Sequence, residues 1–463
     1  MRPFFVIQPS SPRFEQTRRR SVLGSALVRA TSVLMLLGTS TGLARAQTPS
    51  PPPQDETTLG EIPVTGTGTE HVVKLAISPS LSPDMEDVVA RGVVRRDFEL
   101  SGLFEVMGEG KAPPGMYGFD DPVDVPAWQA LGAEVVVKVA ARKTDAKTVE
   151  VLGLAYFTKV GKDPVYQKKF VVTPDEIRVT AHRLTDALLG ALTGRAGGFA
   201  SHLTYAAPWG RARRILTMDA DGHDLKPRSP EGDTAIAPAF GPGGALYYSL
   251  SHQYSPFAAY RDTGTPEKLN LPFSTTIYGV AFDKDNRRMA VAVAENLGSA
   301  VYVGNADGTA LQKVSTTEIA THPVFSPSGK LAWVGGGGKQ GTQRIYVDGK
   351  PVSPSGFAAS APAFCDTEDG VRLVFTVSIG GDRQDLVMTN ERGGGIARLT
   401  QNQGSNTYPA CSSDGRLLAF FSTRKQGAGP GLYVLSLKRW TSQKLSSQLG
   451  ESLRWAPLPS QSP

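Results

Sequence analysis

The chain has 463 residues, 40% of them hydrophobic and 20% charged, so it is long enough for two or three domains. Its formal net charge is +6, but residues 1–46 alone hold seven arginines against one acidic residue, which leaves the remainder neutral. A neutral body carries no electrostatic footprint for nucleic acid, so the composition excludes a nucleic-acid partner.

Residues 1–46 have the pattern of a signal peptide. A basic segment, Arg18–Arg20, precedes an apolar stretch, Thr31–Leu43, that is too short to span a bilayer comfortably. Small residues at Ala44 and Ala46 then provide a cleavage site. We therefore expect export to the periplasm. The paired arginines also resemble a twin-arginine signal, and both the Sec and the twin-arginine routes stay open.

Residues 47–69 are rich in Pro, Thr and Gly and predict a disordered spacer. Residues 70–200 predict a small α/β domain. Ser82 and Pro83 have the residue types of a helix N-cap and first helical position, and Gly102 ends that helix. Thr173 and Glu176 form a capping box that opens a second long helix. Strands are expected at 71–78, 103–107, 134–142, 149–157 and 165–172, with a short helix near Trp128, which suggests a sheet with helices on one face.

One phrase recurs six times in residues 201–463. It combines a short strand, an anchor residue and a Gly-, Ser- or Asp-rich turn, and the anchors are 39 to 47 residues apart. This period is typical of propeller blades. The anchors are Phe240, Phe282, Phe325, Phe364, Cys411 and Trp455.

The sixth copy holds little beyond its inner strand, whereas residues 203–205 and 214–218 supply strands before the first copy. We therefore predict an α/β N-terminal domain plus an all-β six-bladed β-propeller. The ring should close by pairing Leu453–Pro457 with the segment near Tyr205.

The two cysteines, Cys365 and Cys411, lie on equivalent inner strands of adjacent blades but one residue out of phase. Alternate residues of a strand face opposite sides of a sheet. A disulfide is therefore possible, but this pattern favours two small unpaired core residues.

Several segments resemble the TolB family, the periplasmic components of Tol–Pal envelope systems. They are Asp97–Phe104, Ala181–Asp186, Leu192–Gly194 with Gly198 and Phe199, Asp219–Gly222, and Trp455–Pro457. The chain departs from the family in the turns after its anchors and in the spacer of more than twenty residues before Glu70.

The resemblance implies a non-catalytic adaptor that acts in outer-membrane integrity and cell division. Its partners would be a Pal-like peptidoglycan-associated lipoprotein and a TolA-like inner-membrane protein. It would be a monomer that reaches membranes only through these partners.

The loops that enter the inner strands are expected to form the channel mouth and to bind the lipoprotein. Small polar groups there suit a broad, wet protein contact, and Thr276, Gly279 and Thr321 match the family's contact loops best. The candidate partner-binding residues are Thr276, Tyr278, Gly279, Thr321, His322, Asn406 and Thr407.

No catalytic residue, metal or cofactor is predicted. Gly38–Gly42 matches a nucleophile-elbow pattern but lies in the leader. His182 is expected to pack or to donate a hydrogen bond, Asp219 and Asp221 to close a turn, and a cation in the channel is left open.

Two alternatives remain. The first is a TolB-like propeller that binds another envelope ligand, such as a polysaccharide or a secretion component. The second is the propeller of a serine peptidase, which is disfavoured because such chains continue into a hydrolase domain and this one stops at Pro463.

Overall fold

The computed structural model describes residues 71–82, 84–337 and 341–458. The predicted signal peptide, 1–46, and spacer, 47–69, lie outside these residues. Among the helices of the described part, none is both long enough and apolar enough to cross a bilayer.

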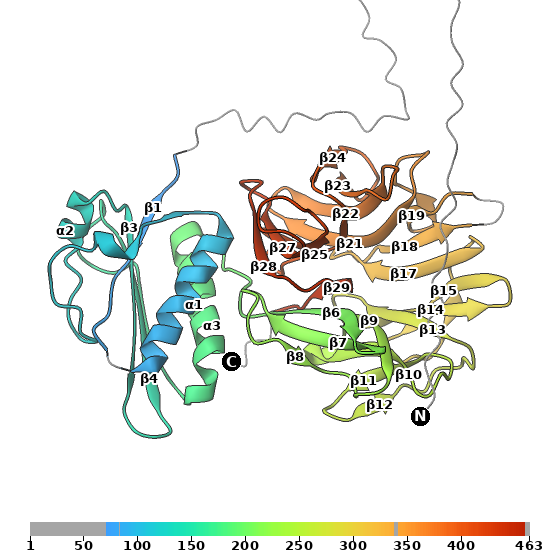
Figure 1. Cartoon of the computed structure of the whole chain (residues 1–463), viewed down its shortest axis with the longest axis horizontal. Coiled ribbons are helices and arrows are strands. Elements are labelled where there is room, and N and C mark those ends of the chain that lie inside the picture. The colour runs from blue at the N-terminus through green and yellow to red at the C-terminus, as the bar shows by residue number, and fades with distance from the viewer. Residues whose placement is uncertain (1–70, 83, 338–340, 459–463) are drawn as a thin grey trace, which may run out of the picture. The chain divides into compact units, whose positions relative to one another are not determined.

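A five-stranded sheet of order β2-β1-β3-β4-β5 forms the centre of the α/β region (Figure 1). Strand β1 is parallel to both of its neighbours, and β3, β4 and β5 are antiparallel. The strands are β1 (Lys74–Ile77), β2 (Glu105–Val106), β3 (Val135–Lys143), β4 (Val149–Phe157) and β5 (Tyr166–Val172). The helices are α1 (Met85–Ser101), η1 (Glu109–Lys111), α2 (Val125–Ala130), η2 (Pro174–Glu176) and α3 (Ile177–Thr193).

Helices lie on both faces of this sheet, so the expectation of one covered face was wrong. The long helices α1 and α3 pack on the face that carries Val135 and Val137. The short helix α2 packs Trp128 on the other face, against Val136 and Tyr156. The alternation of side chains along β3 explains both layers, because its successive residues are apolar and face opposite sides.

Helix ends follow local chemistry with one correction. The capping box of Thr173 and Glu176 is present. The N-cap position of the first long helix is Asp84, which makes no side-chain capping bond, and not Ser82, whose hydroxyl instead accepts the Asp84 backbone N–H at 3.3 Å. Asp84 is held there because its carboxylate accepts the Lys143 backbone N–H at 2.8 Å. Gly102 and Gly194 end the two helices in the left-handed conformation that glycine favours.

The rest of the described chain forms six four-stranded antiparallel sheets arranged as propeller blades (Figure 1). Blade 1 contains β9 (Thr234–Phe240), β10 (Leu246–Ser251), β11 (Ala258–Asp262) and β12 (Pro266–Lys268). Blade 2 contains β13 (Ile277–Phe282), β14 (Arg288–Glu295), β15 (Gly298–Asn305) and β16 (Gln312–Lys313). Blade 3 contains β17 (Ile319–Phe325), β18 (Leu331–Gly336), β19 (Arg344–Val347) and β20 (Lys350–Pro351). A 3₁₀ turn, η3 (Pro242–Gly244), follows β9.

Blades 4 and 5 contain β21 (Ala359–Thr367), β22 (Gly370–Ser378), β23 (Gln384–Asn390), β24 (Ala397–Arg398); β25 (Asn406–Cys411), β26 (Leu417–Ser422), β27 (Gly431–Ser436) and β28 (Ser442–Ser446). Blade 6 combines β29 (Glu451–Trp455) with β6 (His202–Trp209), β7 (Ala212–Asp219) and β8 (Lys226–Pro227).

Blade 6 confirms the predicted closure, because its inner strand β29 pairs with β6 from the start of the propeller. The Trp455 indole N–H donates to the Ser201 hydroxyl at 2.8 Å, and the Ala456 backbone N–H donates to the His202 carbonyl at 2.7 Å. The predicted fold class, an α/β domain followed by a six-bladed propeller, is therefore confirmed. The boundary predicted between residues 200 and 201 stays a prediction.

Cys365 and Cys411 form a disulfide between blades 4 and 5, with Cα atoms 5.3 Å apart, so the preference for unpaired cysteines was wrong. Adjacent blades stack face to face. The side chains that meet between them therefore come from opposite faces of equivalent strands. The one-residue phase difference that argued against a bridge is the offset that a bridge between neighbouring blades requires.

We predict that replacing both cysteines by alanine lowers the free energy of unfolding by up to about 4 kcal/mol, because the bridge closes a 46-residue separation in the unfolded chain. Urea unfolding of oxidised wild type and of the double variant measures this. Thiol titration of the denatured, unreduced protein is the control, and two free thiols per chain would contradict the assignment.

Candidate functional site

The predicted mouth lies where the inner strands β9, β13, β17, β21, β25 and β29 begin. Thr276, Tyr278 and Gly279 sit at the start of β13, and Thr321 and His322 in β17 of the next blade. The structure brings these two groups onto adjacent, packed strands. Asn406 and Thr407, in β25, lie two blades further round the ring.

The mouth residues differ in how far their side chains are available. Tyr278 is 39% exposed, and Thr276, Thr321 and Thr407 are half-buried. Asn406 is fully buried, with its amide nitrogen 3.4 Å from both the Gln384 carbonyl oxygen and an Asp385 carboxylate oxygen. Its contacts fit a residue that holds the loop between blades 4 and 5. As a partner-binding set, the seven residues stay a prediction.

Every inner strand carries one bulge near the mouth, three residues before its anchor. The hydrogen-bond register shifts there in all six blades. The residue three positions before each anchor has positive φ in all six blades, and in four blades it precedes a proline, which has no N–H to lose at a bulge. These residues are Ala237, Gly279, His322, Ala361, Tyr408 and Ser452.

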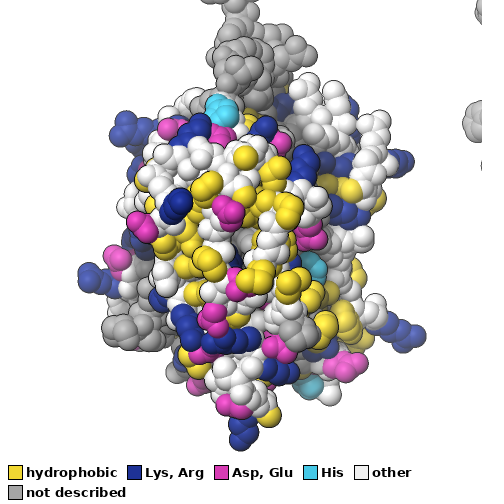
Figure 2. All heavy atoms as spheres, turned by 90° about the vertical axis from the view of Figure 1, so that its left-hand side faces the viewer, with side chains coloured by type: hydrophobic (Ala, Val, Ile, Leu, Met, Phe, Trp, Pro, Cys, Tyr) yellow, Lys and Arg dark blue, Asp and Glu magenta, His cyan; other side chains and the backbone are white. Residues whose placement is uncertain are grey.

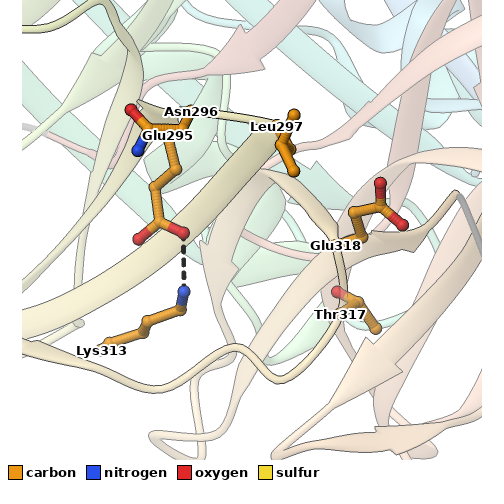
Figure 3. Close-up of a pocket in the computed structure, with 7 residues that line it drawn as sticks. Glu295, Asn296, Leu297, Lys313, Thr317 and Glu318 are labelled. Carbon is orange, nitrogen blue, oxygen red and sulfur yellow. Dashed lines mark hydrogen bonds and ion pairs between the residues drawn. The ribbon is translucent and has the colours of Figure 1, made fainter.

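A cavity of about 460 Å³ adjoins the mouth between blades 2 and 3 (Figure 3). Its walls are the β14–β15 hairpin, with Glu295 and Leu297, and the segment that leads into β17, with Thr317 and Glu318. Glu295 pairs with Lys313 at 2.7 Å, while Leu297 is 89% exposed at the hairpin tip. Sequence reasoning missed this cavity, although an apolar residue in the turn Asn296–Gly298 was a usable signal.

The opposite end of the propeller contacts the α/β region through buried charges. Arg178 of α3 donates to Asp219 at 2.9 Å and to Asp221 at 2.8 Å, in the turn after β7. His182, one helical turn later, places Nδ1 2.8 Å from Asp97 of α1 and Nε2 3.7 Å from Asp219. This network, which we call the interdomain charge cluster, consists of Asp97, Arg178, His182, Asp219 and Asp221.

The electrostatics of this cluster favour a protonated His182. Burial lowers the pKa of its imidazole, but the Asp97 carboxylate and the contact with Asp219 outweigh burial and raise the pKa to about 10. Burial also raises the pKa of Asp97. If burial acted alone, both Asp97 and His182 would be neutral. The second carboxylate decides the position of the proton. Despite burial, its interactions with the nearby His182 and His202 rings and its hydrogen bond from Arg178 lower the pKa of Asp219 well below its usual range. The prediction of a hydrogen-bonding His182 is confirmed.

Asp97, His182 and Asp221 also place one ligand atom each within 4.8 Å of one another, a spacing that a metal ion could use. The Arg178 guanidinium already donates hydrogen bonds to both Asp219 and Asp221. The arrangement therefore fits an ion-pair network better than a cation site.

The linker after α3 is fixed by a carboxylate. Asp186 accepts the backbone N–H groups of Phe199 and Ala200 at 2.8 and 2.9 Å. A side chain at Gly197 would meet the Asp186 oxygen at 2.4 Å, and one at Gly198 would meet Ser413 at 2.9 Å. These contacts explain why glycine stands at both positions.

A separate apolar patch lies on the α/β region, on the side of α2 (Figure 2). Figure 2 shows hydrophobic side chains gathered on this face among charged ones. Exposed Met116 and buried Trp128 line a groove of about 220 Å³ on this region, and exposed Leu131 follows the end of α2. Apolar patches of this kind often mark protein contacts.

Together, a six-bladed propeller and an α/β domain with a mixed sheet define the class of this protein. The model of the family described as "TolB amino-terminal domain" matches residues 60–152. The chain is 26% identical over 196 residues to the Tol-Pal system protein TolB of Roseobacter denitrificans, a match that covers 40% of this chain and 44% of that protein.

The crystal structure of TolB from Acinetobacter baumannii has the same fold, with a TM-score of 0.70 and 21% identity, over 84% of this chain and 97% of that one. The resemblance to TolB that the sequence predicted is therefore confirmed. The curated relative is matched over less than half of its own length.

We predict that stability falls as pH rises from 6.5 towards about 10, because His182 has a higher pKa in the folded chain than in the unfolded one. Its contribution is complete below 6.5, the pKa of an unfolded histidine, and is lost as pH passes the folded value of about 10. The loss is about 1.4 kcal/mol per unit of pKa difference.

Urea unfolding of wild type and His182→Gln across this range measures the effect. The variant keeps a hydrogen-bond donor for Asp97 but does not titrate, so its stability should depend less on pH. Parallel pH profiles for the two proteins would contradict the assignment.

Proposed function

We propose that this chain is a non-catalytic, monomeric adaptor of a Tol–Pal system in the periplasm, acting in outer-membrane integrity and cell division. The supporting observation is that its likeness to TolB extends over both the α/β region and the propeller, within the 84% of the chain that matches TolB from Acinetobacter baumannii. Labelling of the purified protein by a fluorophosphonate probe would contradict the non-catalytic part.

The channel mouth would bind a Pal-like peptidoglycan-associated lipoprotein. Thr276, Tyr278 and Thr321 offer small hydroxyls and one aromatic ring on adjacent strands, and exposed Leu297 stands at the rim of the neighbouring cavity. This combination of an apolar anchor with polar surroundings suits a protein interface.

The α/β domain would bind the TolA-like inner-membrane partner at the surface with Met116 and Leu131. The mouth and the α/β domain lie at opposite ends of the inner strands. Strand β25, for example, runs from Asn406 at the mouth to Cys411, next to the hairpin whose Arg416 donates to Thr193 at 3.0 Å. Binding at one end can therefore act on the other through about 20 Å of rigid sheet.

The double variant Thr276→Trp, Thr321→Trp should lose recovery of the cognate lipoprotein in a pull-down, because two indoles would fill the mouth. Gly279 is left unchanged, since a side chain there would press on the Ala237 methyl group at 3.0 Å. The matched control is Arg287→Trp, an exposed residue in the turn at the far end of β13 that lines neither the mouth nor the channel cavity. Recovery of the lipoprotein by the double variant at the wild-type level would refute the site.

A TolB-like propeller for another envelope ligand is the second candidate. The altered turns after the anchors, such as Gly241–Gly244 and Asp283–Asn286, favour it. The position of the gene beside or away from other Tol–Pal components distinguishes the two.

A further inference from the structure

The residue before each blade's anchor is small in five blades and charged in the sixth. All six of these residues line one cavity of about 630 Å³ at the propeller axis. They are Ala239, Ala281, Val324, Ala363, Ala410 and Arg454. Arg454 therefore places a guanidinium in a channel whose equivalent positions are otherwise aliphatic.

The Arg454 guanidinium has almost no partners. Its one hydrogen bond runs from Nη1 to the carbonyl of the preceding residue, Leu453, at 3.0 Å. Within the described ranges no carboxylate forms an ion pair with it, and burial lowers its pKa to about 10. A guanidinium has five N–H donors, so the half-buried Arg454 keeps several that a ligand in the channel could accept.

The two carboxylates that line the cavity do not form an ion pair with Arg454. Among the residues that line the cavity, Asp283 is bound to Arg288 at 2.9 Å, and Asp366 makes no ion pair with Arg454. Glu451, at the other end of β29, is paired with Arg213. The positive charge of Arg454 therefore has no acidic counterpart from the described chain.

His322, in β17 of blade 3, is a second basic side chain on which the charge of Arg454 acts. Its Nδ1 is 3.0 Å from the Thr321 hydroxyl. With that hydroxyl donating to Nδ1, the ring proton lies on Nε2 and can be donated. Burial, and then the charge of Arg454, lower the pKa of His322 to about 4, so the ring is neutral at pH 7.

We propose that the propeller channel is an oxyanion site, in which the Arg454 guanidinium binds a carboxylate or phosphate group. The planar guanidinium binds two oxygens of such a group at once. The oxyanion could be a free small ion or an acidic side chain that a partner inserts into the channel. Both sources share the same chemistry.

The first experiment uses inorganic phosphate and the whole chain without any partner. Phosphate, compared with chloride at equal ionic strength, should raise the unfolding temperature of wild type by mass action. Arg454→Ala restores the residue found in four other blades and should therefore fold. It should weaken phosphate binding in calorimetry about tenfold or more, because charged hydrogen bonds are lost.

Arg211→Ala, an exposed arginine in the β6–β7 turn of the same blade, is the matched control and should bind phosphate like wild type. Equal phosphate binding by all three proteins would overturn the site, and so would the absence of binding by wild type. In anion-free buffer Arg454→Ala should be at least as stable as wild type, since it removes a half-buried charge that has no ion-pair partner among the described residues.

A second measurement distinguishes the two sources. If a partner's carboxylate occupies the site, Arg454→Ala weakens lipoprotein recovery and phosphate competes with the lipoprotein for wild type. If a free ion occupies the site, neither Arg454→Ala nor added phosphate changes the recovery of the lipoprotein. Because phosphate binding is measured without the lipoprotein, a failure of the proposed adaptor function leaves the channel site standing.

Discussion

The pairing of β29 with β6 is the contact on which the rest of the structure depends. Blades stack only against neighbours, so a ring of six needs one joint between the two ends of the repeat array. Here the joint is made inside a sheet, where Leu453 is buried and Trp455 is tied to Ser201. Without it, β6 would present an unpaired edge and the channel would lose one wall.

The same blade also connects the propeller with the α/β domain. Asp219 and Asp221, which bind Arg178, follow β7 of the closing sheet, and Phe199 lies in the linker just before β6. One hydrophobic core runs from the helices α1 and α3 into blades 5 and 6. Strand β29 therefore links three places: its start at the mouth, Arg454 in the channel, and Trp455 at the α/β side.

The sequence was sufficient for the architecture because the repeat is local and periodic. Anchors such as Phe240 and Phe325 recur with the same turns, and the incomplete last copy revealed the closure. Contacts between blades were harder to predict. The Cys365–Cys411 bridge was disfavoured because the two side chains were expected to point to opposite faces of their sheets. In two stacked blades the faces that meet are opposite ones, so this arrangement brings the cysteines together. Asp84 replaced Ser82 as the helix cap because a distant backbone N–H, that of Lys143, holds it.

The candidate sites show the same limit. The mouth loops followed from topology and from the family resemblance, but the burial of Asn406 depends on its neighbours in blade 4. The sequence shows Arg454 next to the anchor Trp455. That it lacks an ion-pair partner is evident only once the six inner strands surround it in the channel. The charge cluster joins Asp97 to His182 and Asp219, residues far apart in the chain, and no local pattern predicts that meeting.

Hydrogen exchange of a chain that ends at Gly450 tests ring closure most directly, because this change removes β29 and leaves β6 intact. The account predicts fast exchange of the β6 amides that pair with Glu451–Trp455, while β3 and β4 of the α/β domain stay protected as the internal control. Protection of β6 equal to that in the full chain would contradict closure by this strand.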